Sequence, residues 1–345
     1  MISVQHIECG LPEFPLEQGD VVAMAREILV GKIPFVESAL ALISNAGVRS
    51  RRTVRPVQVL FDNQSLKWRN DVYIEGCKNL SEELMDRFLQ QSGLDPKAID
   101  LIITTSCTGF MIPAVDAHLI NRFGLRSDVV RMPLTELGCA AGAMAMSRAY
   151  DFLRAFPQSN VVIIALEFPS LTYQNKDFRV ANLVSCALFG DGGALVHLNG
   201  QPGPCQLRAR KTHFFPNTEH LMGFDLTDSG FEIVLDKAIP DLIQREMADI
   251  LNEFLDQNDL ARADLKHFIF HPGGRKIMDT LREVMALREE DIACSRKVLE
   301  EVGNLSSASI FWVLAEKLRE RPKGPALLGA FGPGFNAELL LAELG

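Results

Sequence analysis

The sequence predicts an α/β fold with buried and largely parallel strands. Short runs rich in β-branched residues alternate with segments of helical periodicity, a pattern typical of strands and helices stacked in layers. Hydrophobic residues make up 47% of the 345 residues and charged residues 23%, so the chain can bury a large core. The helical segments are rich in alanine and methionine, which indicates helices packed in the interior.

Five strands are predicted from apolar runs bounded by polar or turn residues. In chain order these runs are 101–105, 161–166, 194–198, 268–270 and 326–331. Five helices are predicted from apolar residues that recur every three or four positions. These segments are 81–91, 140–156, 238–256, 277–285 and 307–318.

The order of these elements is similar in the two halves of the chain. A strand, a turn, a buried helix and a strand follow one another over 101–166, and a comparable order recurs over 268–331. The Pro/Gly-rich stretch 199–204 lies between them and indicates a boundary. We therefore predict an N-terminal unit, residues 1–200, and a C-terminal unit, residues 201–345.

Composition excludes several classes of protein. The net charge of −9 argues against a dedicated nucleic-acid binder, and no apolar run approaches the 18 residues of a membrane span. The N-terminal residues lack the pattern of a secretory signal. Seven cysteines without a C-x-x-C pair fit reduced thiols better than disulfides or a zinc site. We expect a cytoplasmic protein without a metal site.

Cys139 is the strongest candidate for a nucleophile. It follows Gly138 and precedes an Ala/Met-rich segment that predicts a buried helix. At a helix N-terminus the dipole and free N–H groups favour a thiolate, lowering a cysteine pKa from about 8.5 to 7 or below. The alternative is that Cys139 is a small buried hydrophobe, the usual state of a free cysteine.

Two further residues interrupt their local patterns. His271 ends an apolar strand and precedes Pro-Gly-Gly, where it can donate a hydrogen bond, move a proton or be structural. Asn304 precedes Ser306 and Ser307, which can cap the next helix, and its amide can donate to an oxyanion. With Cys139 they would supply a nucleophile and two donors, although their spacing does not show that they meet.

Five motifs, in this order, resemble those of the type III polyketide synthases, the chalcone-synthase-like branch of the thiolase superfamily. They are Leu-Gly-Cys at 137–139, Ala-Leu-Phe-Gly-Asp-Gly-Gly at 187–193, His-Pro-Gly-Gly at 271–274, Gly-Asn-Leu-Ser-Ser at 303–307 and Gly-Ala-Phe-Gly-Pro-Gly at 329–334. The resemblance covers nearly the whole chain. It implies a homodimer with the thiolase fold, five layers αβαβα built from two similar halves.

The resemblance also implies roles for individual residues. Cys139 matches the nucleophile that carries the acyl group, as a thiolate paired with the His271 imidazolium. His271 and Asn304 match the pair that binds the thioester carbonyl, promotes decarboxylation of malonyl-CoA and stabilises the enolate. Phe189 matches the gatekeeper between the CoA tunnel and the inner cavity, and a second gatekeeper position falls on Ile233. The implied substrates are malonyl-CoA and an acyl-CoA, with no acyl carrier protein and no metal or redox cofactor.

Candidate residues for the substrate pocket come from the same resemblance. Cys107 matches a cysteine that faces the active site in the bacterial branch, including tetrahydroxynaphthalene synthases; the alternative is a small space-filling residue. Phe224 stands where those enzymes have tyrosine. This favours alkylpyrone or alkylresorcinol-type products from fatty acyl-CoA, with a tetrahydroxynaphthalene-type use of malonyl-CoA alone as the alternative. The other expected wall residues are Thr172, Ser185 and Ser306.

Three arginines, Arg49, Arg52 and Arg55, lie in a basic run that matches the CoA-phosphate region of the family, although such runs are also common on solvated surfaces.

Two rival hypotheses for the function of the chain remain. β-Ketoacyl synthase III uses the same three residue types, but its histidine motif usually reads His-Gln-Ala-Asn. A non-catalytic thiolase-fold scaffold would be expected to lack one of the three.

Overall fold

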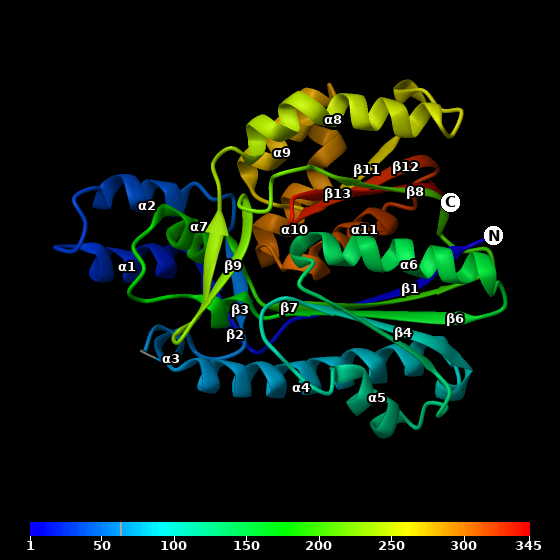
Figure 1. Cartoon of the computed structure of the whole chain (residues 1–345), viewed down its shortest axis with the longest axis horizontal. Coiled ribbons are helices and arrows are strands. Elements are labelled where there is room, and N and C mark those ends of the chain that lie inside the picture. The colour runs from blue at the N-terminus through cyan, green and yellow to red at the C-terminus, as the bar shows by residue number, and fades with distance from the viewer. Residues whose placement is uncertain (63) are drawn as a thin grey trace.

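The computed structural model describes residues 1–62 and 64–345, and a mixed sheet of nine strands runs through it (Figure 1). The strand order is β11 (His267–Phe270), β12 (Gly324–Gly332), β13 (Asn336–Leu344), β8 (Cys205–Phe214), β1 (Ser3–Gly10), β7 (Gly192–Asn199), β6 (Asn160–Glu167), β4 (Ile99–Ser106) and β5 (Val130–Thr135). β1 and β8 pair over two residues only, Ser3 with Gln206 and Val4 with Cys205. The sheet therefore consists of two halves joined at one edge.

Helices separate and cover these two half-sheets, giving five layers (Figure 1). α4 (Leu66–Ser92) and α5 (Val115–Phe123) cover one outer face, and α8 (Ile239–Asp256) and α9 (Arg275–Val284) cover the other. α6 (Ala141–Ala155) and α11 (Ser309–Arg319) lie between the half-sheets. The largest hydrophobic cluster fills this central layer, with side chains from both helices and both half-sheets. The predicted αβαβα architecture is confirmed.

The two halves repeat one topology. In the first half β4 is parallel to β6, while β7 is antiparallel to both β6 and β1. In the second half β11 is parallel to β12, while β13 is antiparallel to both β12 and β8. α6 precedes β6 as α11 precedes β12, so the two central helices occupy equivalent positions. The internal similarity is real at the level of topology, whereas the boundary at residue 200 stays a prediction.

The expectation of largely parallel strands was wrong. Within the large sheet, as far as the structure describes it, three neighbouring pairs are parallel and five are antiparallel. Strands buried on both faces read as continuous apolar runs in either direction, so the sequence pattern does not reveal their polarity. All ten predicted elements are present, and segment 81–91 is the second half of the longer α4.

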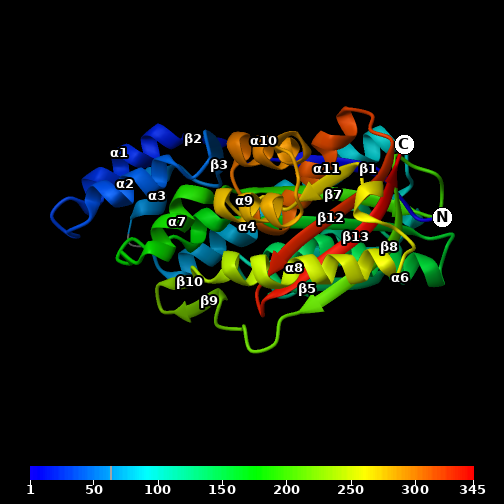
Figure 2. The same ribbon diagram turned by 90° about the horizontal axis from the view of Figure 1, so that it is seen from above.

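The sequence did not predict the remaining elements. The strands among them are β1, β5, β8 and β13 of the large sheet and the shorter β2 (Phe14–Glu17), β3 (Ser50–Thr53), β9 (Met222–Thr227) and β10 (Gly230–Leu235). The helices are α1 (Gln18–Leu29), α2 (Val36–Ser44), α3 (Val57–Phe61), α5, α7 (Val180–Leu188) and α10 (Ala293–Val302), and the described residues also form six 3-10 turns, among them η2 (Gly138–Ala140) and η6 (Ser306–Ala308). α1 and α2 lie at the end of the molecule opposite both chain termini, with the β9–β10 hairpin nearer to them than to the termini (Figures 1 and 2). In the described part of the chain, no helix has the length and apolar character needed to cross a bilayer.

The central helices approach so closely that a glycine is required at one contact. A Cβ added at Gly142 of α6 would lie 2.1 Å from the carbonyl oxygen of Ser307, in η6 directly before α11. We expect Gly142→Ala to lower the free energy of unfolding by about 3 kcal/mol, as overpacking against a rigid backbone does. Gly19→Ala in α1 is the matched control, because no atom lies within 4 Å of its added Cβ and alanine favours a helix by about 1 kcal/mol. Urea titration would contradict this account if both variants unfolded at the same midpoint.

Candidate active site

Cys139, His271 and Asn304 line one cavity with a volume of about 1210 Å³. Cys139 lies in η2, immediately before α6, and Asn304 lies between α10 and η6, just before α11. The two residues therefore stand at the N-terminal ends of the two equivalent central helices. His271 directly follows β11 in the C-terminal half. The fold brings together three residues that are far apart in the sequence, and the cavity lies where the two halves meet.

The turn that carries Cys139 packs tightly against the C-terminal glycine motif. Gly138 has a φ of 50°, in the left-handed region, and a Cβ there would lie 2.5 Å from Pro333 Cδ. A Cβ at Gly332 would lie 2.6 Å from the carbonyl oxygen of Leu137. The Gly-Pro-Gly sequence after β12 thus forms the surface on which the nucleophile turn rests.

Burial opposes the acidic thiol that was expected at Cys139. Burial raises the pKa of Cys139 to about 12, outweighing the smaller opposing effects of the Ser306 hydroxyl and the backbone N–H of Cys139 itself. Buried Glu167 raises the pKa of Cys139 further. A cavity wall of low polarity favours the neutral thiol more strongly than one helix end favours the thiolate.

His271 is buried and neutral. Burial lowers its pKa to about 3, and neither ring nitrogen has a hydrogen-bond partner among the described residues. Burial of both groups therefore opposes the expected ion pair between Cys139 thiolate and His271 imidazolium, which stays a prediction. A buried imidazole with both nitrogens free has one donor and one acceptor available for a ligand. Transfer of the Cys139 proton to this ring would leave the net charge of the cavity unchanged.

Asn304 presents a free amide donor to the cavity. Its Oδ1 accepts the backbone N–H of Ser306 at 2.8 Å and the Ser309 hydroxyl at 3.4 Å. Because Oδ1 is thus occupied by donors, the Nδ2 group is the end of the amide left for a bound oxygen. The side chain is buried, so its orientation is fixed before a substrate enters.

A polar network lies beneath the nucleophile. The Ser306 hydroxyl is 3.7 Å from Cys139 Sγ and 3.4 Å from Cys107 Sγ, so both thiols contact one oxygen. Cys107 lines the cavity, and its N–H donates to Glu167 at 3.1 Å. The Ser307 hydroxyl donates to the same carboxyl group at 2.6 Å. Burial raises the pKa of Glu167, so this group favours the protonated form more than a surface glutamate does.

The other five predicted wall residues also line the cavity. Phe189 directly follows α7, while Phe224 and Ile233 face each other across the β9–β10 hairpin. Ser185 lies in α7, and Thr172 donates its hydroxyl to the carbonyl oxygen of Pro169 at 2.8 Å. The structure thus places all predicted wall residues around one space, while their roles stay predictions.

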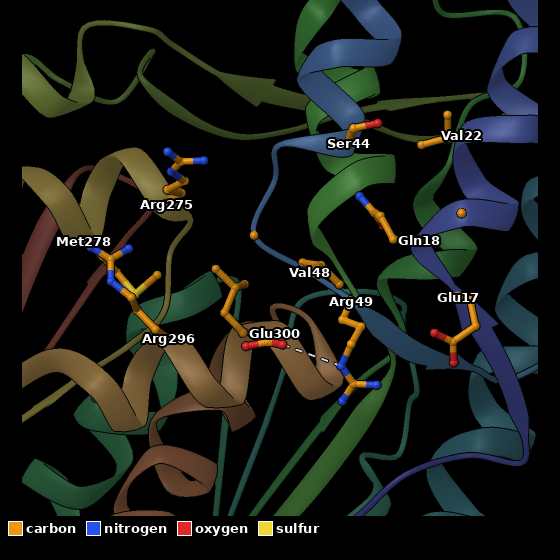
Figure 3. A pocket seen from close by; sticks show the side chains of 13 residues that line it. Glu17, Gln18, Val22, Ser44, Val48, Arg49, Arg275, Met278, Arg296 and Glu300 are labelled. Atoms are coloured by element: carbon orange, nitrogen blue, oxygen red, sulfur yellow. Dashed lines mark ion pairs between the residues drawn. The ribbon is translucent and has the colours of Figure 1, made fainter. Parts of the chain in front are cut away.

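The three predicted arginines lie elsewhere. Arg52 donates to the carbonyl oxygen of Glu13 and Arg55 pairs with Glu75, and neither lines the catalytic cavity. Arg49 lines a neighbouring cavity of about 790 Å³ together with Arg275 and Arg296. Figure 3 shows the Arg49 guanidinium turned toward Glu300, 3.6 Å away. The basic run therefore does not converge on the nucleophile.

Sequence reasoning missed several residues of the site. Glu167 was detectable, because it ends the apolar run of β6 with a carboxylate that the strand buries. Arg275 and Lys276 begin α9 and line the catalytic cavity, yet they directly follow the His-Pro-Gly-Gly motif that drew attention to His271. Arg275 also lines the neighbouring cavity, where Figure 3 shows its side chain, and is thus shared by the two cavities.

Burial raises the pKa of the Cys139 thiol and lowers that of His271, and this contrast predicts how alkylation of the thiol depends on pH. In His271→Ala the thiol has no proton acceptor, so with a pKa of about 12 its alkylation by iodoacetamide should rise about tenfold per pH unit from pH 7 to 10. The wild-type enzyme should react faster at pH 7, because His271 can take the proton. Mass spectrometry of the Cys139 peptide measures both rates, with Cys107→Ala as a control. Equal rates in wild type and His271→Ala would rule out His271 as the acceptor.

Comparison with known proteins shows similarity along nearly the whole chain. The family model for "FAE1/Type III polyketide synthase-like protein" matches residues 28–210, and that for "Chalcone and stilbene synthases, C-terminal domain" matches residues 206–343. A 1,3,6,8-tetrahydroxynaphthalene synthase of Streptomyces griseus is 35% identical, covering 97% of this chain and 90% of the relative. A phloroglucinol synthase of Pseudomonas fluorescens is 36% identical, covering 90% of each chain.

Solved structures agree with the sequence comparison. The crystal structure of 1,3,6,8-tetrahydroxynaphthalene synthase from Streptomyces coelicolor, a bacterial type III polyketide synthase, superposes with a TM-score of 0.95. The two proteins are 34% identical, and the match covers 99% of each chain.

Proposed function

The chain belongs to the type III polyketide synthase family, and we propose that it extends an apolar acyl-CoA starter with malonyl-CoA on Cys139. As a member of this family it is an acyltransferase that performs decarboxylative Claisen condensation. The size and the apolar lining of the cavity support the proposal of an apolar starter. Around the nucleophile the cavity is large and lined mainly by apolar side chains of α7, the β9–β10 hairpin and α8.

The first chemical step loads the starter. The Cys139 sulfur forms a bond to the thioester carbonyl carbon as its proton passes to His271, and the bond from that carbon to the CoA sulfur breaks. The departing CoA thiolate takes the proton from His271 and leaves as the thiol. Both Cys139 and His271 are neutral in the free structure, so the step begins and ends without a net buried charge.

The second step makes the carbon nucleophile. Malonyl-CoA loses carbon dioxide, and the electrons of the broken bond move into an enolate whose oxygen needs donors in the absence of water. The neutral His271 ring and Asn304 Nδ2 can supply two, and neither has to give up a protein partner. The enolate carbon then attacks the Cys139 thioester, and repeated extension precedes cyclisation. Every step balances without a redox reaction, so we propose that no metal or redox cofactor takes part.

The starter that we favour is a fatty acyl-CoA, with alkylpyrone or alkylresorcinol-type products. Phe224 packs edge to face on Phe231 at 5.7 Å and adds no hydroxyl group to the wall. Ile233, opposite Phe224, leaves more room than the phenylalanine expected of a second gatekeeper. An alkyl chain gains about 0.8 kcal/mol for each CH₂ buried in such surroundings.

A second candidate is the use of malonyl-CoA alone. Two relatives at 35% and 34% identity are named 1,3,6,8-tetrahydroxynaphthalene synthases, and Cys107 contributes a second thiol to the cavity here. Under this hypothesis the apolar wall would enclose the growing polyketide instead of an alkyl starter.

One product profile decides between the two candidates. The enzyme is incubated with malonyl-CoA and no acyl carrier protein, alone and with acyl-CoA starters of increasing chain length. We expect extended products that incorporate the long starters. A single aromatic product from malonyl-CoA alone, unchanged by added starters, would establish the second candidate, and no condensation in any mixture would refute both.

We further propose that Arg275 and Lys276 hold the CoA phosphates. Both side chains are exposed, line the catalytic cavity and form no ion pair with another described residue. Substituting both by alanine should raise KM for malonyl-CoA about tenfold, a loss of about 1.4 kcal/mol, and leave kcat unchanged. The N-acetylcysteamine thioester of malonate, which lacks the phosphates, should react equally well with both enzymes. The Arg52→Ala control should keep the wild-type KM for malonyl-CoA. A rise as large as that of the double variant would refute a specific role of Arg275 and Lys276.

We also propose that the enzyme is a cytoplasmic homodimer. Ile112 is 96% exposed, and Phe110 and Val130 are more than two-fifths exposed. Val130 begins β5, the edge strand of the large sheet, whose unpaired side can meet another chain. Ile112→Asp should shift the protein toward monomer in sedimentation velocity; an unchanged dimer would exclude this surface.

A further inference from the structure

The backbone of Asn304 is held by the segment that carries Phe189. The Asn304 N–H donates to the carbonyl oxygen of Leu188 at 2.9 Å, and the Gly190 N–H donates to the carbonyl oxygen of Asn304 at 3.0 Å. These two bonds form a parallel bridge between Phe189 and Asn304. Any shift of residues 188–190 therefore moves the amide that the enolate would need.

Arg51 fixes this segment from behind. It lies in β3 with 3% of its surface exposed, and its Nη1 donates to the carbonyl oxygens of Cys186 at 2.7 Å and Phe189 at 3.3 Å. These carbonyls end α7, where the helix dipole favours a cation. A Cβ at Gly190 would lie 3.0 Å from Arg51 Cβ, so the bridge residue rests directly on the arginine.

Ser50 of β3 and Arg49, the residue before this strand, also hold the other side of Asn304. The Ser50 hydroxyl donates to the carbonyl oxygen of Glu301 at 2.9 Å, and the Arg49 N–H donates to that of Glu300 at 2.8 Å. Glu300 and Glu301 lie in the last turn of α10, which leads through Gly303 into Asn304. One short strand thus contacts both backbone segments that determine where Asn304 lies.

Global stability alone does not account for a guanidinium at this position. Nε and Nη2 of Arg51 are buried without a hydrogen-bond partner among the described residues, and burial lowers its pKa to about 10, which leaves it charged at neutral pH. A buried charge with unsatisfied donors costs free energy, and apolar replacements of such groups are often neutral or stabilising. Buried Asp191 offsets part of this cost, because its carboxyl group favours the charged guanidinium. The two hydrogen bonds that Arg51 donates both go to the segment 186–190.

We propose that Arg51 is a positioning residue that holds Asn304 in place for decarboxylation, through the segment 186–190. The inference rests on the proposed role of Asn304. The proposal gives this role to Arg51 and not to Arg49 or Arg52, whose side chains bind Glu300 and the carbonyl oxygen of Glu13 instead. It also explains why Arg51 is buried although Arg49 is exposed and Arg52 is half-buried.

The test compares two half-reactions in Arg51→Met and Arg51→Lys. Decarboxylation of malonyl-CoA needs Asn304, whereas acylation of Cys139 in a single turnover needs the thiol and His271. We expect Arg51→Met to slow decarboxylation about tenfold or more, since small misplacements of a catalytic group cost up to about 100-fold, and to leave acylation within about threefold. Arg51→Lys, which keeps the charge and can reach one carbonyl, should recover part of the loss even if the methionine variant is poorly folded.

Controls separate this inference from the proposed function. Arg69→Met removes another buried arginine, which donates to the carbonyl oxygen of Leu171 at 2.9 Å, and should leave the ratio of the two rates unchanged. An unchanged ratio in both Arg51 variants, or an equal loss of both rates, would overturn the positioning role. Asn304→Ala is measured alongside: full decarboxylation there refutes the role of Asn304, whereas loss there with retention in the Arg51 variants refutes Arg51 alone.

Discussion

Cys139→Ala abolishes formation of condensed products, by more than about 10³-fold, as removal of a covalent nucleophile does. The physical reason is that the growing chain needs a covalent attachment point between extensions. The other thiol of the cavity is Cys107, whose pKa is raised by its burial and by Glu167, so it is a poor substitute. Malonyl-CoA should still lose carbon dioxide in this variant, because the enolate donors Asn304 and His271 remain. Acetyl-CoA without longer products is the expected outcome, measured by liquid chromatography of the CoA esters.

The control for this experiment is Cys205→Ala, which removes a fully buried cysteine far from the cavity lining and should retain condensation. Mass spectrometry of the wild-type protein after brief incubation with an acyl-CoA should find the acyl group on the Cys139 peptide. Condensed products from Cys139→Ala at the wild-type rate, or acylation confined to Cys107, would refute the assignment of the nucleophile.

Several buried elements of the fold were predictable, whereas other buried elements, such as β13, and the polar ones were not. α6 and α11 are nearly all apolar on their inner faces, and β6 is a continuous apolar run from Val161 to Leu166, so burial of these elements can be recognised in the sequence. β3 reads Ser-Arg-Arg-Thr and forms a strand only because β2 pairs with it. Tertiary contacts overrode local propensity there.

The candidate catalytic residues were recognisable from motifs, but their electrostatics were not. The helix N-terminus at Cys139 suggested an acidic thiol, whereas the depth of the cavity raises the pKa of this group and lowers that of His271. Desolvation depends on what surrounds a group in three dimensions, and flanking residues do not reveal it. Arg51 shows the same limit, since its sequence neighbours gave no sign that it alone is buried.

Asn304→Ala should slow decarboxylation of malonyl-CoA by about 10² to 10³-fold, a loss of about 3 kcal/mol of transition-state stabilisation. Its Nδ2 is a donor held in place before the reaction, because Oδ1 is fixed by the Ser306 N–H at 2.8 Å. The donor gains strength only as negative charge develops on the enolate oxygen, so kcat should fall while KM for malonyl-CoA changes little. Release of carbon dioxide from labelled malonyl-CoA measures both.

The same substitution leaves the Ser306 N–H without its acceptor, so a structural explanation of any loss has to be separated from a catalytic one. Asn182→Ala is a suitable control, because Asn182 is an equally buried asparagine of α7 whose amide bonds only to Gln174 and Asp177. If both variants lose a similar amount of thermal stability and only Asn304→Ala loses decarboxylation, the amide acts on the substrate. Decarboxylation at the wild-type rate in Asn304→Ala would instead leave His271 as the sole enolate donor, and a two-donor oxyanion site would no longer describe this cavity.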